Sequence, residues 1–121
     1  MKDQRKEFGR RGEDRAAAFF LLRGFRIIER NWSCRMGEID LICRKNGVTR
    51  FIEVKTRRTR AFGNPEESIT AGKMQRLERA VLAYMSSKEL SWDNVHVDAL
   101  AILAEPGKPP EYHYLEDILG A

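Results

Sequence analysis

Three segments in the first half of the chain have the apolar patterns of β-strands. Residues 25–32 centre on Ile27 and Ile28, and residues 38–44 and 49–55 are rich in Ile, Leu, Val and Phe. Asn46-Gly47 lies between the second and third segments, and this pair favours a two-residue hairpin turn because both positions need a positive φ. The pattern therefore predicts three strands, the last two joined as a hairpin.

Two other segments have helical periodicity. Residues 9–23 contain strong helix formers and end before Gly24, where a C-terminal capping glycine is expected. The apolar stripe of this helix consists of Ala16, Ala17, Phe20 and Leu21. Glu13 lies one turn before Ala17 and is expected on the same, core-facing side. A second helix is predicted to start after residues 64–67 or after Thr70, because its apolar residues have helical spacing: Met74, Leu77, Val81, Tyr84 and Met85.

The remaining elements complete a mixed α/β domain. Residues 92–104 predict a strand, 106–110 a loop, 112–115 a short edge strand and 116–119 a final helical turn. The predicted order is α-β-β-β-α-β-β, with one layer of sheet. A length of 121 residues fits a single domain spanning 1–121, of which residues 1–8 are expected to be flexible.

The composition indicates an intracellular protein with a basic surface. No apolar run is long enough to span a membrane, and the charged N-terminus has no apolar segment of a secretory signal behind it. Cys34 and Cys43 are expected to be reduced packing residues of a cytoplasmic protein, without zinc. The net charge of +4 favours an acidic polymer as partner.

The hairpin register predicts a cluster of charged side chains. If Asn46-Gly47 is the turn, facing residues sum to 93, so Asp40 lies opposite Glu53 and Glu38 lies opposite Lys55. On the other face, Ile39 would meet Val54 and Leu41 would meet Ile52. A cluster of Glu38, Asp40, Glu53 and Lys55 is thus expected at one end of the hairpin, and Glu13 would join it if the first helix packs on that face.

Opposed carboxylates repel each other in a sheet, and a hard divalent cation such as Mg²⁺ offsets that repulsion. The simpler alternative is a solvated sheet face with cross-strand ion pairs. The apolar neighbours of Asp40 and Glu53 argue against an open surface. His96 and His113 have no paired nucleophile in the sequence, so neither is expected to be catalytic.

Basic residues extend from the predicted site. Along the loop after the third strand, and on the two helices, they are Lys55, Arg57, Arg58 and Arg60, then Arg10, Arg11, Lys73, Arg76 and Arg79. Such residues bind backbone phosphates without reading bases. The alternative is a solvated basic loop that only aids solubility.

The motifs resemble a known group of nucleases. Gly37-Glu38-Ile39-Asp40 followed by Glu53-Val54-Lys55 is similar to the PD-(D/E)xK signature, although Ile39 stands where the signature has proline. Together with Gly12-Glu13, Asn31-Trp32 and Lys73, the series resembles the YraN-like family of uncharacterised bacterial proteins, which is grouped by fold with Holliday-junction resolvases.

The resemblance implies a restriction-endonuclease-like mixed sheet flanked by helices. It also implies that Asp40 and Glu53 ligate Mg²⁺ or Mn²⁺, that Glu13 is a further acidic ligand or supports the ligands, and that Lys55 positions the attacking water. The expected activity is a structure-selective endonuclease on branched or junction DNA, for which a homodimer would suit cleavage of two strands. The alternatives are a catalytically silent nucleic-acid-binding module with the same fold, and an interaction protein with a fortuitous acidic cluster.

Overall fold

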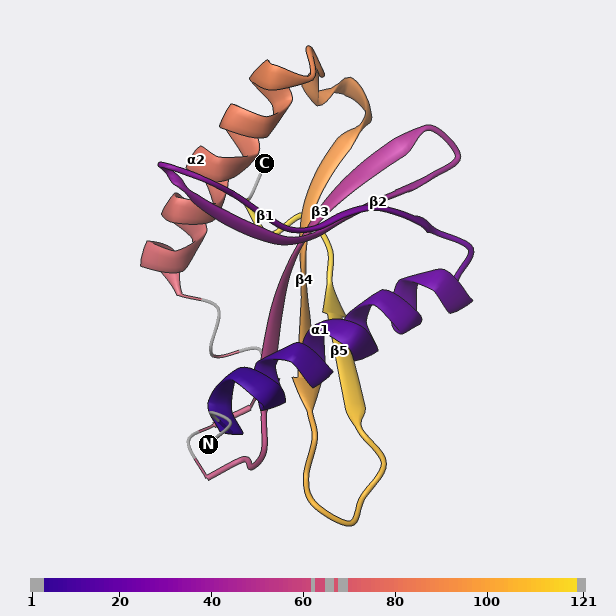
Figure 1. The fold of residues 1–121 in the computed structure, drawn as a ribbon, viewed down its shortest axis with the longest axis vertical. Coiled ribbons are helices and arrows are strands. Elements are labelled where there is room, and N and C mark those ends of the chain that lie inside the picture. Colours follow the sequence, from indigo (N-terminus) through magenta and orange to yellow (C-terminus); the bar gives the residue numbers. More distant parts are fainter. Residues whose placement is uncertain (1–3, 62, 65–66, 68–69, 120–121) are drawn as a thin grey trace.

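A computed structural model describes residues 4–61, 63–64, 67 and 70–119, the side chains of residues 4–6 excepted. The elements are, in chain order, α1 (Gln4–Leu22), β1 (Arg26–Cys34), β2 (Gly37–Lys45), β3 (Val48–Arg57), α2 (Ala71–Ser87), a short 3₁₀ helix (Trp92–Asn94), β4 (Val95–Leu103) and β5 (Glu111–Leu115) (Figure 1). The predicted order of helices and strands is confirmed.

The strands form one five-stranded sheet in the order β1-β2-β3-β4-β5. Neighbouring strands are antiparallel except β3 and β4, which are parallel. A parallel pair needs a crossover connection, and α2 supplies it between β3 and β4. The sheet is therefore a mixed sheet, as the sequence predicted.

Each face of the sheet is covered by one helix. On one face, the buried residues of α2 pack against Ile42, Phe51 and Val97. On the other, Ala16, Phe19 and Phe20 of α1 pack against Leu41, Ile52 and Leu100. Figure 1 shows α1 crossing β4 and β5, and stacking of Phe19 on Tyr112, with ring centroids 5.2 Å apart, confirms the contact with β5.

The hairpin register is confirmed near the turn and ends before the acidic residues. Asn46 and Gly47 have φ values of 52° and 79°, and the β2–β3 ladder runs from Lys45↔Val48 to Leu41↔Ile52. Ile39 and Ile42 both pack on the α2 side, so the alternation of β2 shifts between them. Ile39 is therefore not on the same face as Val54, which packs on the α1 side.

Four further expectations need correction. Helix α1 starts at Gln4 rather than near Gly9, so residues 4–8 are helical, while residues 1–3 lie outside the described part. Leu21 is 56% exposed and Phe19 is buried in its place. Residues 116–119 form no helix and contain only a turn at 118–119. The basic segment after Lys55 begins inside β3. In the described part of the chain no helix is long and apolar enough to cross a membrane.

Candidate metal and nucleic-acid site

A cavity of about 390 Å³ opens between the first turns of α2 and the end of the β1–β2–β3 layer. It is lined by residues from three places: Ser33, Cys34, Gly37 and Glu38 around the β1–β2 turn, Glu53 and Lys55 on β3, and Lys73, Arg76 and Leu77 on α2. The N-cap of α2 is Thr70, whose hydroxyl accepts from the Lys73 N–H and so fixes where the helix starts.

The helix and the strand turn are packed closely at this cavity. A Cβ atom on Gly37 would lie 3.1 Å from the carbonyl oxygen of Arg76, and Gly37 has a φ of 152°. Leu77 is 3% exposed and anchors the same face of α2 in the core. Helix α2 therefore holds Lys73 and Arg76 directly across from Glu53 and Lys55.

Glu53 lines the cavity and forms a pair of carboxyl groups with Asp40, which is not itself a lining residue. Where the β2–β3 ladder ends, the Val54 N–H donates to Asp40 Oδ2 at 2.8 Å, so the Asp40 side chain takes the position of a backbone acceptor. A side-chain hydrogen bond joins Asp40 and Glu53. Lys55 Nζ lies 3.5 Å from Glu53 Oε1, and the Glu53 and Lys55 side chains are 15% and 28% exposed.

Burial makes it costly to ionise both acids. Desolvation, followed by the charge of Glu53, raises the pKa of Asp40 to about 7, and Glu13 and Glu38 add to the shift against the Val54 hydrogen bond. Burial also raises the pKa of Glu53, although Lys55, the Asp40 hydrogen bond and Lys73 oppose it. The two acids therefore titrate as a pair, and Asp40 keeps its proton to a higher pH than an isolated aspartate does.

Glu13 lies at the side of this pair rather than within it. Its Oε2 accepts from Asn31 Nδ2 at 3.0 Å, and it lines a separate cavity with Gly9, Arg10, Asp14, Arg30 and Asn31. Its charge still raises the pKa of Asp40. Among the described residues no three His, Cys, Asp or Glu side chains converge as a metal-ligating group. The role of Glu13 as a third ligand therefore stays a prediction.

Sequence comparison places the chain in a family. The model of the uncharacterised protein family UPF0102 matches residues 12–102, which include Glu13, the hairpin acids and Lys73. The chain belongs to UPF0102. The likeness to YraN-like proteins predicted from the motifs is thereby confirmed.

Curated relatives of this UPF0102 protein cover nearly its whole length. A UPF0102 protein of Nocardia farcinica is 39% identical over 94% of this chain and 90% of the relative. A UPF0102 protein of Syntrophomonas wolfei is 39% identical over 91% of this chain and 96% of the relative. One from Neisseria meningitidis serogroup C is 40% identical over 93% and 94%. The family description gives no activity, so the site itself must support any function.

Six of the basic residues predicted to bind nucleic acid separate into three groups in this UPF0102 protein. Lys73 and Arg76 line the cavity beside Lys55, and burial, Lys55 and Arg57 lower the pKa of Lys73, against the charge of Glu53. Arg11 and Arg58 lie instead at a cavity with Phe8, where the Arg58 guanidinium covers the Phe8 ring at 4.3 Å. Arg60 forms ion pairs with Glu105 and Glu111.

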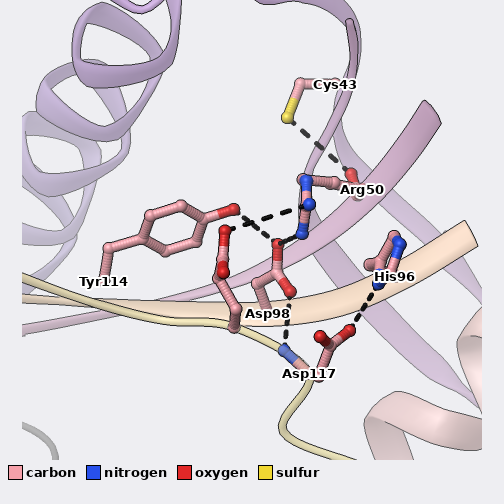
Figure 2. Close-up of polar contacts among 7 residues, drawn as sticks. Cys43, Arg50, His96, Asp98, Tyr114 and Asp117 are labelled. Carbon is pink, nitrogen blue, oxygen red and sulfur yellow. Dashed lines mark hydrogen bonds and ion pairs between the residues drawn. The ribbon is translucent and has the colours of Figure 1, made fainter. Parts of the chain in front are cut away.

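A buried polar network on the opposite face was not predicted from the sequence. Asp98 is fully buried and accepts from Arg50 at 2.9 Å, from the Tyr114 hydroxyl at 2.6 Å and from the Asp117 N–H at 2.9 Å (Figure 2). Burial and Asp98 raise the pKa of Tyr114. Two features of the sequence could have indicated it: Asp98 interrupts the apolar run of β4, and Arg50 lies near the start of β3.

Both histidines contact acidic side chains. His96 Nδ1 pairs with Asp117, next to the Asp98 network, and His113 Nε2 lies 3.2 Å from Glu111. These contacts support the structural roles expected for them.

Proposed function

We propose that this protein hydrolyses phosphodiester bonds in DNA with a divalent metal ion held by Asp40 and Glu53. The observation that supports this most is the half-buried carboxyl pair of Asp40 and Glu53, with Lys55 3.5 Å from Glu53 and a cationic wall across the cavity. Carboxylates that could bind a metal ion and basic side chains that could bind a phosphate thus lie together at one concave site.

The residues present fit Mg²⁺ or Mn²⁺. The two carboxyl groups are costly to ionise together, and the ammonium group of Lys55 lies close to Glu53 only. A hard cation would stabilise the doubly ionised pair. Mg²⁺ typically binds one or two carboxylates and keeps several waters. Such an ion supplies charge neutralisation at the phosphate and an acidified water when bound. Glu13 would add negative charge behind Asp40 or act as a further ligand.

The side chains around the pair divide the remaining work. Lys55 holds Glu53 and can orient the attacking water or neutralise a phosphate oxygen. The Val54 N–H fixes the Asp40 carboxylate so that one oxygen remains for a ligand. These roles, with the mixed sheet, support a PD-(D/E)xK-type, restriction-endonuclease-like enzyme. The basic side chains at the cavity are suited to phosphates rather than to base edges, so branched or junction DNA is the proposed substrate, with a homodimer suited to two-strand cleavage.

A panel of duplex, flapped and four-way-junction DNA, with Mg²⁺, Mn²⁺ or a chelator, tests this function. We expect metal-dependent cleavage of a branched substrate, and a loss of at least about 100-fold in Glu53→Gln because a metal ligand is replaced. Glu78→Gln, an exposed glutamate of α2, is the matched control and should cleave like the parent protein. Cleavage that survives Glu53→Gln would exclude the site assignment.

One observation favours a second candidate, a catalytically silent module that binds nucleic acid. Lys55 already neutralises Glu53, and the described residues include no third acid in ligating position. This candidate predicts salt-dependent DNA binding without metal-dependent turnover on any member of the panel.

A further inference from the structure

The α2 wall of the cavity is cationic, whereas the strand side contributes Glu53, one member of the carboxyl pair. Lys73 and Arg76 are three residues apart on α2 and so lie on one face of the helix, about 4.5 Å apart along its axis. Both line the cavity opposite Glu53. A single cavity therefore has a region for a cation and a separate region for an anion.

Further cations of β3 lie near Lys73. In addition to burial, the charges of Lys55 and Arg57 both disfavour the charged form of Lys73 and lower its pKa. Glu53 interacts with both lysines, and its Oε1 lies 3.5 Å from Lys55 Nζ. Like charges held this close raise the energy of the empty site, and a bound anion with several oxygens would lower it.

We propose that Lys73 and Arg76 form a phosphate subsite, distinct from the carboxyl pair, that takes a neighbouring phosphate of the same nucleic-acid strand. The inference rests on the proposed function, because the carboxyl pair and Lys55 are assigned to the phosphate that is cleaved. It specifies the substrate as a polynucleotide rather than a single phosphodiester. Arg76 is exposed and supplies a planar, bidentate donor group, while Lys73 is half-buried and supplies a point charge.

Binding without divalent ions tests the subsite independently of hydrolysis. Fluorescence anisotropy with labelled junction DNA in a chelator gives the slope of log K against log salt concentration. We expect the Lys73→Ala/Arg76→Ala variant to reduce the magnitude of this slope by about 1.4–1.8, since each lost phosphate contact contributes about 0.7–0.9. Lys73→Arg keeps the positive charge and should keep most of the contribution of Lys73 to the slope.

Two control proteins sharpen the result. Arg26→Ala/Arg44→Ala removes the same charge from exposed positions of β1 and β2 outside the cavity and should change the slope by less than about 0.5. Glu78→Gln, which changes an exposed glutamate of α2 outside the cavity, should keep the full slope. An equal slope change in both double variants, an unchanged slope in Lys73→Ala/Arg76→Ala, or no DNA binding by the parent protein would overturn the subsite. Binding with the expected slopes but no hydrolysis would instead leave the subsite in place and exclude the enzymatic function.

Discussion

At the scale of single residues, the site depends on one carboxyl group whose surroundings are not visible in the sequence. The nearness of Asp40 and Glu53 was predictable from the Asn46-Gly47 turn, because a two-residue turn fixes the register. The regular ladder, however, ends at Leu41↔Ile52 and does not pair the two acids directly. The hydrogen bond from the Val54 N–H was not predictable, because it exists only where the strand ladder fails. That local failure places Asp40 in contact with Glu53 instead of in a regular strand pair.

The raised pKa of Asp40 predicts that the stability of the folded protein depends on pH. Because the unfolded chain loses this proton near pH 4 and the folded protein near pH 7, the folded state binds more protons in between, and the free energy of unfolding falls as pH rises. Asp40→Asn keeps the hydrogen bonds without the charge. The difference in the free energy of unfolding between Asp40→Asn and the parent protein should therefore be about 2–3 kcal/mol more favourable to the variant at pH 8 than at pH 5.

Urea denaturation in a chelator at both pH values measures this difference. Asp14→Asn, which changes an exposed carboxylate paired with Arg30, is the control and should show little difference between the two pH values. An Asp40→Asn effect equal at pH 5 and pH 8 would show that Asp40 ionises normally in the folded protein.

The two cysteines should differ sharply in reactivity. Cys43 is fully buried, and burial together with Asp98 raises its pKa to about 12, whereas Cys34 is half-buried and lines the candidate cavity. A thiol reagent should therefore modify one cysteine quickly in the native protein and the second only after denaturation. Peptide mapping should place the fast label on Cys34, and DNA should slow its labelling. Rapid labelling of Cys43 would contradict the packing described.

At the scale of elements, local signals predicted the strands, the hairpin and α2, but not which helix covers the acidic face. The Thr70 cap and the apolar spacing of α2 are short-range features. The packing of α1 on the Leu41 and Ile52 face depends on the whole sheet, and with α1 on that face Glu13 contacts Asn31 of β1. The Asp98 network could not be predicted for the same reason, because its members come from three strands and the segment after β5.

The packing of α1 on β3 predicts opposite effects for two glycines of one helix. A Cβ on Gly12 would lie 2.1 Å from Thr56 Oγ1 and 3.1 Å from Thr56 Cβ, whereas a Cβ on Gly9 would meet no atom within 4 Å. Gly12→Ala should therefore destabilise by about 1–3 kcal/mol through overpacking. Gly9→Ala should stabilise by about 0.5–1 kcal/mol through helix propensity. Thermal and urea unfolding would measure both, and stabilisation by Gly12→Ala would contradict the close approach of α1.

At the scale of the whole molecule, the two faces of the sheet have different roles. The α2 face contains the candidate site, and the α1 face contains the Asp98 network that ties Tyr114 and Asp117 to β3 and β4 (Figure 2). A substitution in the network should therefore change stability and leave the site intact.

Removing the Asp98 carboxylate tests this separation. Asp98→Ala leaves Arg50 and the Tyr114 hydroxyl without their buried acceptor and should destabilise by about 3–5 kcal/mol. Tyr114→Phe removes one hydrogen bond to a charged group and should cost about 1.5–3 kcal/mol, with DNA binding of the folded protein unchanged. Asp93→Ala, at an exposed position, is the control. Loss of DNA binding by folded Tyr114→Phe would show that the two faces are coupled.

Calorimetric titration with Mn²⁺ near pH 7 tests whether Asp40 and Glu53 together hold a divalent metal ion. The parent protein should bind Mn²⁺ at or below millimolar concentration and release a proton, because the proton that the pair retains must leave, so the measured heat should vary with the ionisation enthalpy of the buffer. Asp40→Asn and Glu53→Gln should each abolish this binding. The absence of Mn²⁺ binding by the parent protein at millimolar concentration, or binding unchanged in both variants, would contradict the account.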